Sequence, residues 1–293
     1  MARMHRRSRE NLGLETLLVM TTLPARLQTW WTILRIALAE RLVYRGDFAL
    51  GTLMRFLPIV TQIFLWFAVF QARGQPTLAG YSYQDFVAYY LLTMLARAFS
   101  SMPGLASGIA AQIRSGEIKK FLIQPVDLLG FLLLCRVAHK LAYYSVAALP
   151  FALVFFLCRD YFPGWPDAVT LAAGVASLVL AFLLGFFLEA AMGLIGFWWL
   201  EVSSLLFVYM LLSFFLSGHM FPLDMLPGRW QTAVHLTPLM YLAYFPAAVL
   251  LGKVQGLALA QGLAIQAGWV LGMIALARWL WARGTRHYSA FGG

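Results

Sequence analysis

The stretch AVTLAAGVASLVLAFLLGFFLEAAMGLIGFWWLEVSSLLFVYMLLSFFLSG, residues 168–218, contains only two charged side chains, Glu189 and Glu201. An α-helix needs about 20 mostly apolar residues to cross about 30 Å of hydrocarbon. The stretch therefore has room for two membrane spans, joined by a short turn at residues 193–197. A soluble domain has no place for so long an apolar run, so we expect a helical membrane protein.

Four other apolar stretches meet the same length criterion, at residues 48–70, 86–107, 138–158 and 257–280. The chain is 61% hydrophobic and 12% charged, which leaves too little polar surface for a soluble globule. These observations predict an all-α polytopic protein with six transmembrane helices.

The basic residues predict how the spans are oriented, because lysine and arginine accumulate in cytoplasmic loops. With six spans, one side would carry Arg3, Arg6, Arg7, Arg9, Arg26, Arg35, Arg41, Arg45, Arg114, Lys119, Lys120, Arg136, Lys140, Arg278, Arg283 and Arg286. The other side would carry only Arg73, Arg159, Arg229 and Lys253. Both termini are then predicted to be cytoplasmic. The net charge of +10 fits a face apposed to anionic lipid, so we expect no nucleic-acid partner.

Residues 232–251 are apolar but contain Pro238 and Pro246. If they crossed the membrane, the basic C-terminal tail would move to the outer side, against the charge rule. We therefore expect residues 218–252 to form a re-entrant helical hairpin that enters the outer leaflet. Non-helical backbone at that depth must be satisfied by protein or water.

The N-terminal region predicts a helix that lies in the membrane interface. Five apolar side chains fall on one helical face: Leu27, Trp30, Trp31, Leu34 and Leu38. A simple membrane anchor remains an equal alternative. The expected domains are a flexible basic lead at 1–24, an amphipathic interface helix at 25–46, a six-span permease domain at 47–283 and a cytoplasmic tail at 284–293.

No catalytic motif is recognisable. The chain has no Gly-x-x-x-x-Gly-Lys-Ser/Thr phosphate loop, no His-Glu-x-x-His zinc helix and no Gly-x-Ser-x-Gly elbow. The five histidines are scattered, which disfavours a metal site. We therefore expect that the chain is not an enzyme, that it binds no cofactor or metal, and that it does not hydrolyse ATP by itself.

Two stripes of polar residues are predicted inside the membrane. In the second span, Arg97 lies near the midplane, where an unpaired charge costs several kcal/mol, and Pro103 is expected to kink the helix. The residues that share these faces are Thr93, Arg97, Ser100 and Ser101 in the second span and Tyr209, Ser213 and Ser217 in the fifth. The stripes indicate a translocation path or a dimer interface. Interhelical hydrogen bonding is the alternative, with equal weight for the serines.

Three groups of residues resemble a known family. They are Tyr44-Arg45-Gly46-Asp47-Phe48; Ile113-Arg114-Ser115-Gly116-Glu117-Ile118 followed by Leu122-Ile123-Gln124-Pro125-Val126; and Ser217-Gly218 with Phe221-Pro222, Leu226-Pro227, Pro238 and Tyr241. In this order, on the predicted sides, they resemble the permeases of type-2 ATP-binding-cassette (ABC) exporters, most of all the bacterial stand-alone six-span branch. The resemblance covers residues 35–283.

The resemblance implies a partner ATPase subunit that carries ATP and Mg. Residues 112–120 would be the coupling helix that docks on this ATPase. The interface helix before the first span, with Arg41 and Arg45, would be a second ATPase contact. The residues themselves suit docking, because apolar anchors stand within a charged rim. This docking set is Gln112, Ile113, Arg114, Gly116, Glu117, Ile118, Lys119, Lys120 and Phe121. The alternative is an amphipathic loop on lipid headgroups.

The resemblance also implies a dimer of permease chains, identical or different, with the second and fifth spans near its interface. The outer hairpin would be a pair of short helices broken at Pro222, Pro227, Pro238 and Pro246. We expect a subunit of a bacterial inner-membrane exporter for amphipathic, drug-like or lipid-like cargo, surrounded by membrane lipid. The alternatives are an ion-coupled secondary transporter, which the apparent lack of a mid-membrane carboxylate disfavours, and a non-transporting scaffold.

Overall fold

The computed structural model describes residues 27–41, 45–162, 164–199 and 201–288. These residues are mostly helical and fall into two compact units. The first unit comprises the described residues of 1–49 together with 125–148, and the second comprises residues 50–124 together with the described residues of 149–293. The predicted flexible lead, residues 1–24, lies outside the described residues.

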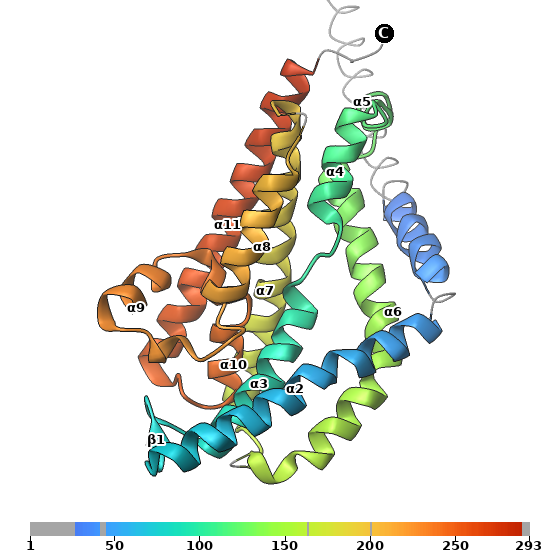
Figure 1. The fold of residues 1–293 in the computed structure, drawn as a ribbon. Helices are drawn as coiled ribbons and strands as arrows, with labels where there is room; N and C mark the ends of the chain where they lie inside the picture. The colour runs from blue at the N-terminus through green and yellow to red at the C-terminus, as the bar shows by residue number, and fades with distance from the viewer. Residues whose placement is uncertain (1–26, 42–44, 163, 200, 289–293) are drawn as a thin grey trace, which may run out of the picture. The chain divides into compact units, whose positions relative to one another are not determined.

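A helix over residues 27–41 comes first and carries no label in Figure 1. The labelled α-helices are α2 (Arg45–Arg73), α3 (Tyr83–Ser100), α4 (Leu105–Arg114), α5 (Lys119–Ile123), α6 (Leu128–Leu157), α7 (Ala168–Leu194), α8 (Ser203–Leu216), α9 (Gly228–His235), α10 (Tyr244–Leu250) and α11 (Gly256–His287). The 3-10 helices are η1 (Arg159–Tyr161), η2 (Ile195–Phe197), η3 (Leu223–Met225) and η4 (Pro238–Leu242). Two short strands, β1 (Thr77–Leu78) and β2 (Tyr81–Ser82), form an antiparallel hairpin that the sequence did not predict.

Among the described residues, four helices are long and apolar enough to cross a membrane: Phe56–Arg73, Leu128–Leu157, Ala168–Phe197 and Gly256–His287. They correspond to the first, third, fourth and sixth predicted spans. The fifth, α8, has only 14 residues, which is about 21 Å of helix, less than a full hydrocarbon core. Helix α11 continues to His287 and so includes the first residues of the predicted tail, residues 284–293.

The second predicted span, residues 86–107, is a broken helix and not a kinked one. Helix α3 ends at Ser100, and α4 starts only at Leu105. Proline disfavours helical geometry in the residue before it, which here is Met102. Gly104 then adopts a left-handed conformation at φ 74°, which only glycine reaches at little cost. The prediction of a kink at Pro103 was therefore wrong, and residues 101–104 form a break between two helices.

Helix α7 is the centre of the second unit, where it lies against α3, α4, α10 and α11 (Figure 1). Its glycines allow very close approach. A β-carbon on Gly193 would stand 2.6 Å from the backbone oxygen of Ala106 in α4, and one on Gly196 would stand 3.2 Å from the α-carbon of Ala110. Because side chains are absent at these points, α4 packs directly on the end of α7 and on η2.

The outer segment, residues 218–252, supplies much of the core of the second unit. Met240, Tyr241 and Phe245 are buried in a cluster with side chains of α3, α7 and α11. Pro222 and Pro227 directly precede η3 and α9, and Pro238 is the first residue of η4, so these three prolines stand at the starts of short helices. Pro246 marks no break, because it stands in the first turn of α10, where a helix needs no backbone N–H.

In the first unit, the helix over residues 27–41 replaces the expected interface helix of residues 25–46, and α2 begins at Arg45. Trp30 packs against Gly130 near the start of α6, since a β-carbon there would lie 3.1 Å from the indole. Asp127 accepts a 2.7 Å hydrogen bond from the Gly130 backbone N–H. Trp31 is exposed. The apolar face of the helix over residues 27–41 therefore has two parts: Trp30 packs on α6, and Trp31 remains exposed.

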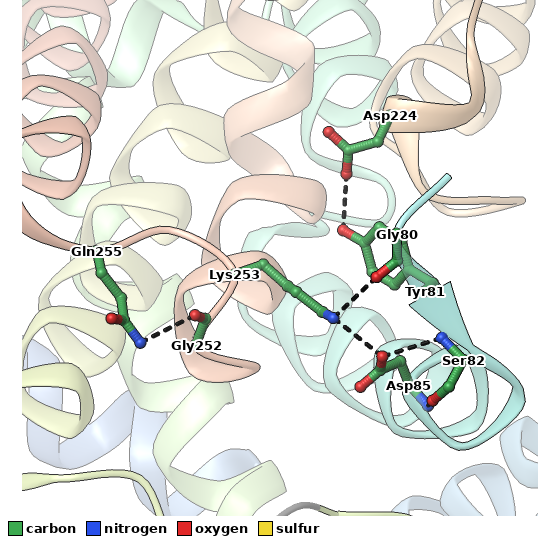
Figure 2. A network of polar contacts seen from close by, with 8 residues as sticks. All are labelled: Gly80, Tyr81, Ser82, Asp85, Asp224, Gly252, Lys253 and Gln255. Carbon is green, nitrogen blue, oxygen red and sulfur yellow. Dashed lines mark hydrogen bonds and ion pairs between the residues drawn. The ribbon is translucent and has the colours of Figure 1, made fainter. Parts of the chain in front are cut away.

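A polar network joins the β-hairpin to the outer segment (Figure 2). Lys253 Nζ binds the Asp85 carboxylate at 2.9 Å and the Gly80 carbonyl at 3.1 Å. Tyr81 donates a 2.7 Å hydrogen bond to Asp224, which also accepts one from Tyr244. Burial, together with the hydrogen bond to Asp224, raises the pKa of Tyr81, so this phenol stays protonated as a donor.

We expect the Lys253–Asp85 pair to stabilise the fold. Their side chains are 32% and 20% exposed, so solvent screens the pair only in part. A double-mutant cycle with Lys253→Met and Asp85→Asn should give a coupling energy of about 1 kcal/mol in unfolding experiments in detergent. The Arg159–Asp160 pair is the control, because its side chains are 65% and 87% exposed and its coupling should be near zero. Equal couplings would contradict this expectation.

Candidate functional site

A cleft of about 840 Å³ lies in the second unit between α2, α3, α7 and α8. It brings the two predicted polar stripes together. Arg97 Nη1 on α3 donates a 3.3 Å hydrogen bond to Ser213 Oγ on α8. The stripe residues that line the cleft are Thr93, Arg97, Ser100, Ser101, Tyr209 and Ser213. Ser217 is buried outside the lining. The sequence interpretation of one shared path is thus compatible with the geometry, although the role of the path is a proposal.

Arg97 occupies the last turn of α3, immediately before the break. The C-terminal end of a helix carries a partial negative charge, which stabilises a cation placed there. The backbone N–H of Ser101 closes this turn by donating to the carbonyl of Arg97 at 2.9 Å. The break therefore explains how a guanidinium is accommodated in an apolar environment.

Glu189 was expected beside the turn at residues 193–197, solvated or paired with a basic residue, with a proton-relay role as the less favoured alternative. In the structure it lies within α7 and lines the cleft. Its Oε1 accepts a 3.3 Å hydrogen bond from the backbone N–H of Met102, and so pairs one backbone donor of the break at residues 101–104. The available signal was a lone carboxylate in a long apolar run, which by default marks a functional position. Glu189 is a carboxylate inside the cleft, whereas the sequence had disfavoured secondary transport for lack of a carboxylate within the membrane.

Other polar groups of the cleft differ in their bonding. The Thr93 hydroxyl donates to the Tyr90 carbonyl of its own helix, so this bond does not join two helices. Ser100 Oγ and His219 Nδ1 are buried without a hydrogen-bond partner among the described residues, and both residues line the cleft. Most of the wall is apolar, with side chains such as Ile59, Met94, Phe207 and Phe214. A largely apolar wall with a few polar groups is typical of ligand-binding clefts.

The predicted coupling helix, residues 112–120, is a turn between two helices. Helix α4 ends at Arg114 and α5 begins at Lys119. The three expected apolar anchors, Ile113, Ile118 and Phe121, are buried within the chain itself. They cannot serve as anchors for a partner, and this part of the interpretation was wrong. Ile113 packs near η2, where a β-carbon on Gly196 would stand 3.5 Å from Ile113 Cδ1.

The exposed surface of this turn is charged, with two apolar side chains that sequence reasoning did not assign. Leu122 and Ile123 follow the turn, and Ile123 is 84% exposed. The exposed charged residues of the predicted docking set are Arg114, Glu117, Lys119 and Lys120, whereas Gln112 and Gly116 are half-buried. Apolar side chains within a charged rim therefore exist here, at positions shifted from those predicted.

Arg114 also binds Glu201, which precedes α8, at 3.3 Å. A hydrogen bond from the Ser203 side chain, supported by the Ser203 backbone N–H, lowers the pKa of Glu201, so this carboxylate is ionised at neutral pH. The second predicted ATPase contact, at Arg41 and Arg45, stays a prediction. Arg41 is half-buried near the end of the first helix, and Arg45 opens α2.

Comparison with known protein families gives a match over residues 56–292 to the ABC-2 family transporter proteins. The chain belongs to this family. It is a multi-pass membrane permease component of ABC transporters, and its family implies an ABC ATPase as its partner. The ABC-2 permeases are membrane components and not ATPases, in agreement with the lack of ATPase motifs. A search of curated proteins gave no match to the chain.

Proposed function

We propose that this permease is the membrane subunit of an ATP-driven exporter for an amphipathic cargo. The observation that carries the proposal is the cleft beside the broken helix, because discontinuous helices at membrane depth are typical of transport sites. In this proposal the chain crosses the bacterial inner membrane six times, with α3–α4 and α8 as the second and fifth crossings. Both termini are cytoplasmic.

Helix α4 supports a mechanical route from the ATPase to the cleft. Its C-terminal end leads into the exposed turn at residues 115–118, and its N-terminal end borders the break at residues 101–104. Close contacts with Gly193 and Gly196 tie it to α7 and η2. A push on the turn would thus move α4 as a rigid body and change the cleft at the break. ATP can shift this equilibrium only by its differential affinity for the two states.

A second permease chain, identical or different, completes the proposed transporter. Helix α8 supports this arrangement, because its exposed side chains outside the cleft include Val208, Leu211 and Phe215, while Ser213 faces Arg97. In a bilayer such a face contacts lipid or another permease chain. A dimer around α8 would enclose the cleft more fully than one chain does.

Secondary transport is the second candidate, and Glu189 is the observation that favours it. A carboxylate within a membrane cleft is the group that ion-coupled transporters require. Membership of the ABC-2 family favours the ATP-driven alternative, since these permeases are components of ABC transporters. A non-transporting scaffold would share the turn but needs no polar cleft.

The exposed turn is tested by charge reversal. We expect Lys119→Glu with Lys120→Glu to reduce the ATPase recovered with the detergent-solubilised chain at least about tenfold, because the charged rim would then repel its partner. The double variant Arg159→Glu with Arg229→Glu is the control, since it makes the same charge change on the predicted outer side. The measurement is quantitative mass spectrometry of the pull-down from the native host.

The intact chain decides between the candidate functions. If no ATPase accompanies it under conditions that preserve assemblies, the ATP-driven proposal loses its main support. Ion-gradient-driven transport in vesicles that contain only this permease would then favour secondary transport. A co-purifying second permease of different sequence would indicate a heterodimer.

A further inference from the structure

The charges in the cleft wall suggest the chemical class of its ligand. Of the residues that line the cleft, Arg97 brings a cation and Glu189 a carboxylate, and they come from different helices, α3 and α7. Transfer of a net charge into an apolar environment is costly unless that charge is compensated. A wall with one group of each sign therefore favours a ligand that also carries one group of each sign.

The order of the lining groups gives the ligand a direction. Along α3 the lining side chains are first Tyr90 and Met94, then Arg97, and finally the break at residues 101–104. Glu189 contacts that break through the Met102 N–H. From the end nearer α4, the charged groups of the wall thus come in the order carboxylate, guanidinium, and the apolar side chains of Met94 and Phe214 lie beyond the guanidinium.

A third polar group of the cleft, the Ser100 hydroxyl, lies one helical turn after Arg97. Ser100 follows Arg97 by three residues on the same helical face and lines the cleft. Its side chain is 2% exposed, and its Oγ has no hydrogen-bond partner among the described residues. A buried polar group without a partner is uncommon in a native fold and calls for an explanation. An anionic group held at Arg97 would accept a hydrogen bond from this hydroxyl.

We propose that the cleft binds a zwitterionic amphiphile whose terminal cation lies at Glu189, whose anionic group lies at Arg97 and Ser100, and whose apolar tail lies along Met94 and Phe214. This is the order of charges in a phosphoethanolamine headgroup, where an amine is terminal and a phosphate lies next to the tail. The inference rests on the proposed function, because it names the cargo class of the same cleft.

The test uses the full permease in nanodiscs without its ATPase, so it is independent of the docking experiment. Four radiolabelled probes share one alkyl tail: a lysophosphatidylethanolamine, an anionic lysophosphatidylglycerol, a cationic alkyltrimethylammonium and a sulfobetaine. The sulfobetaine is zwitterionic with the reversed order of charges. We expect lysophosphatidylethanolamine to bind about tenfold more tightly than each of the others.

Two substitutions should shift this selectivity in opposite directions. Glu189→Gln should move the preference about tenfold toward the anionic probe, and Arg97→Gln about tenfold toward the cationic probe. If Glu189 and Arg97 had a purely structural role, the two substitutions would weaken the binding of all four probes alike. Glu201→Gln and Arg114→Gln are matched controls, because they make the same charge changes on an exposed ion pair outside the cleft, and they should leave the selectivity unchanged.

Several outcomes would overturn the inference. These are equal or tighter binding of the sulfobetaine, tightest binding of the anionic probe to the unaltered protein, or a uniform loss of affinity in both variants. If selectivity is absent while the ATPase is still recovered in the pull-down, this inference fails and the proposed function stands. If the probes bind selectively but no ATPase is recovered, the inference about the ligand stands and the proposed ATP-driven function fails.

Native mass spectrometry of the protein purified from membranes identifies the source of the ligand. A co-purified ethanolamine lipid that the probe displaces supports the inference with a membrane lipid as ligand. A cleft that arrives empty and then binds the probe supports it with a free amphiphile as ligand. A co-purified anionic lipid that the probe does not displace would overturn it.

Discussion

Gly185→Ala is expected to lower the free energy of unfolding by about 4 kcal/mol, among the largest effects for a single methyl group. Gly185 lies in the middle of α7, where a β-carbon would stand 2.0 Å from the carbonyl oxygen of Ser100. The obstacle is backbone that no rotamer change can move. It also lies next to the break, so any shift would disturb Arg97 and the cleft. This cost exceeds the gain in helix propensity, about 1 kcal/mol, that alanine brings over glycine.

The matched controls are Gly268→Ala and Gly272→Ala in α11, where an added β-carbon meets nothing within 4 Å. They should be neutral or stabilising by up to about 1 kcal/mol. The measurement is unfolding in detergent followed by tryptophan fluorescence, together with the monodisperse fraction in gel filtration. If Gly185→Ala behaves like these controls, the close approach of α3 to α7 is wrong.

Gly218→Ala should cost about 3 kcal/mol, for two separate reasons. Gly218 has φ +77°, a left-handed conformation that costs other residues about 1–2 kcal/mol. Its β-carbon would also stand 2.7 Å from Tyr244 Cβ and 2.7 Å from the Tyr89 hydroxyl. That hydroxyl donates a 2.5 Å hydrogen bond to the Gly218 carbonyl, so the turn that leads into the outer segment would be displaced. Overpacking of this kind adds about 1–3 kcal/mol.

Gly80→Ala separates these two contributions. Gly80 has a similar φ of +80°, but its β-carbon would meet nothing within 4 Å. This variant should therefore lose only the conformational part, about 1 kcal/mol. The same unfolding measurement applies to both variants. Equal losses for Gly80→Ala and Gly218→Ala would show that steric contact with Tyr89 and Tyr244 contributes nothing.

The parts of the fold that follow from local sequence were predictable. Long apolar runs indicated the helices α2, α6, α7 and α11, because span length depends only on bilayer thickness and helix rise. The prolines of residues 218–252 were expected to break short helices, and Pro222, Pro227 and Pro238 stand where short helices start, since proline restricts its own backbone. The resemblance to ABC exporter permeases, carried by three short motifs, agrees with the family match.

The candidate site was predicted only in part. The stripes that contain Arg97 and Ser213 were recognised from helical spacing, which places residues on one face. Glu189 was assigned to a turn, because sequence spacing does not show which backbone a side chain reaches. The apolar anchors Ile113, Ile118 and Phe121 were misassigned for a related reason. A hydrophobic side chain next to charges can face a partner or its own core, and both patterns look alike.

The sequence by itself therefore determined the membrane class, the approximate spans and the residues that carry charge into them. Tertiary structure alone decided that Arg97 and Glu189 share one cleft, that the Ser100 hydroxyl has no hydrogen-bond partner among the described residues, and that Ile123 is exposed while Ile118 is buried. The physical reason is the separation in sequence between the residues that interact. Helix formation and membrane insertion depend on neighbouring residues, whereas the meeting of α3, α7 and α8 depends on contacts between residues about a hundred positions apart, which glycine surfaces on α7 permit and local patterns do not encode.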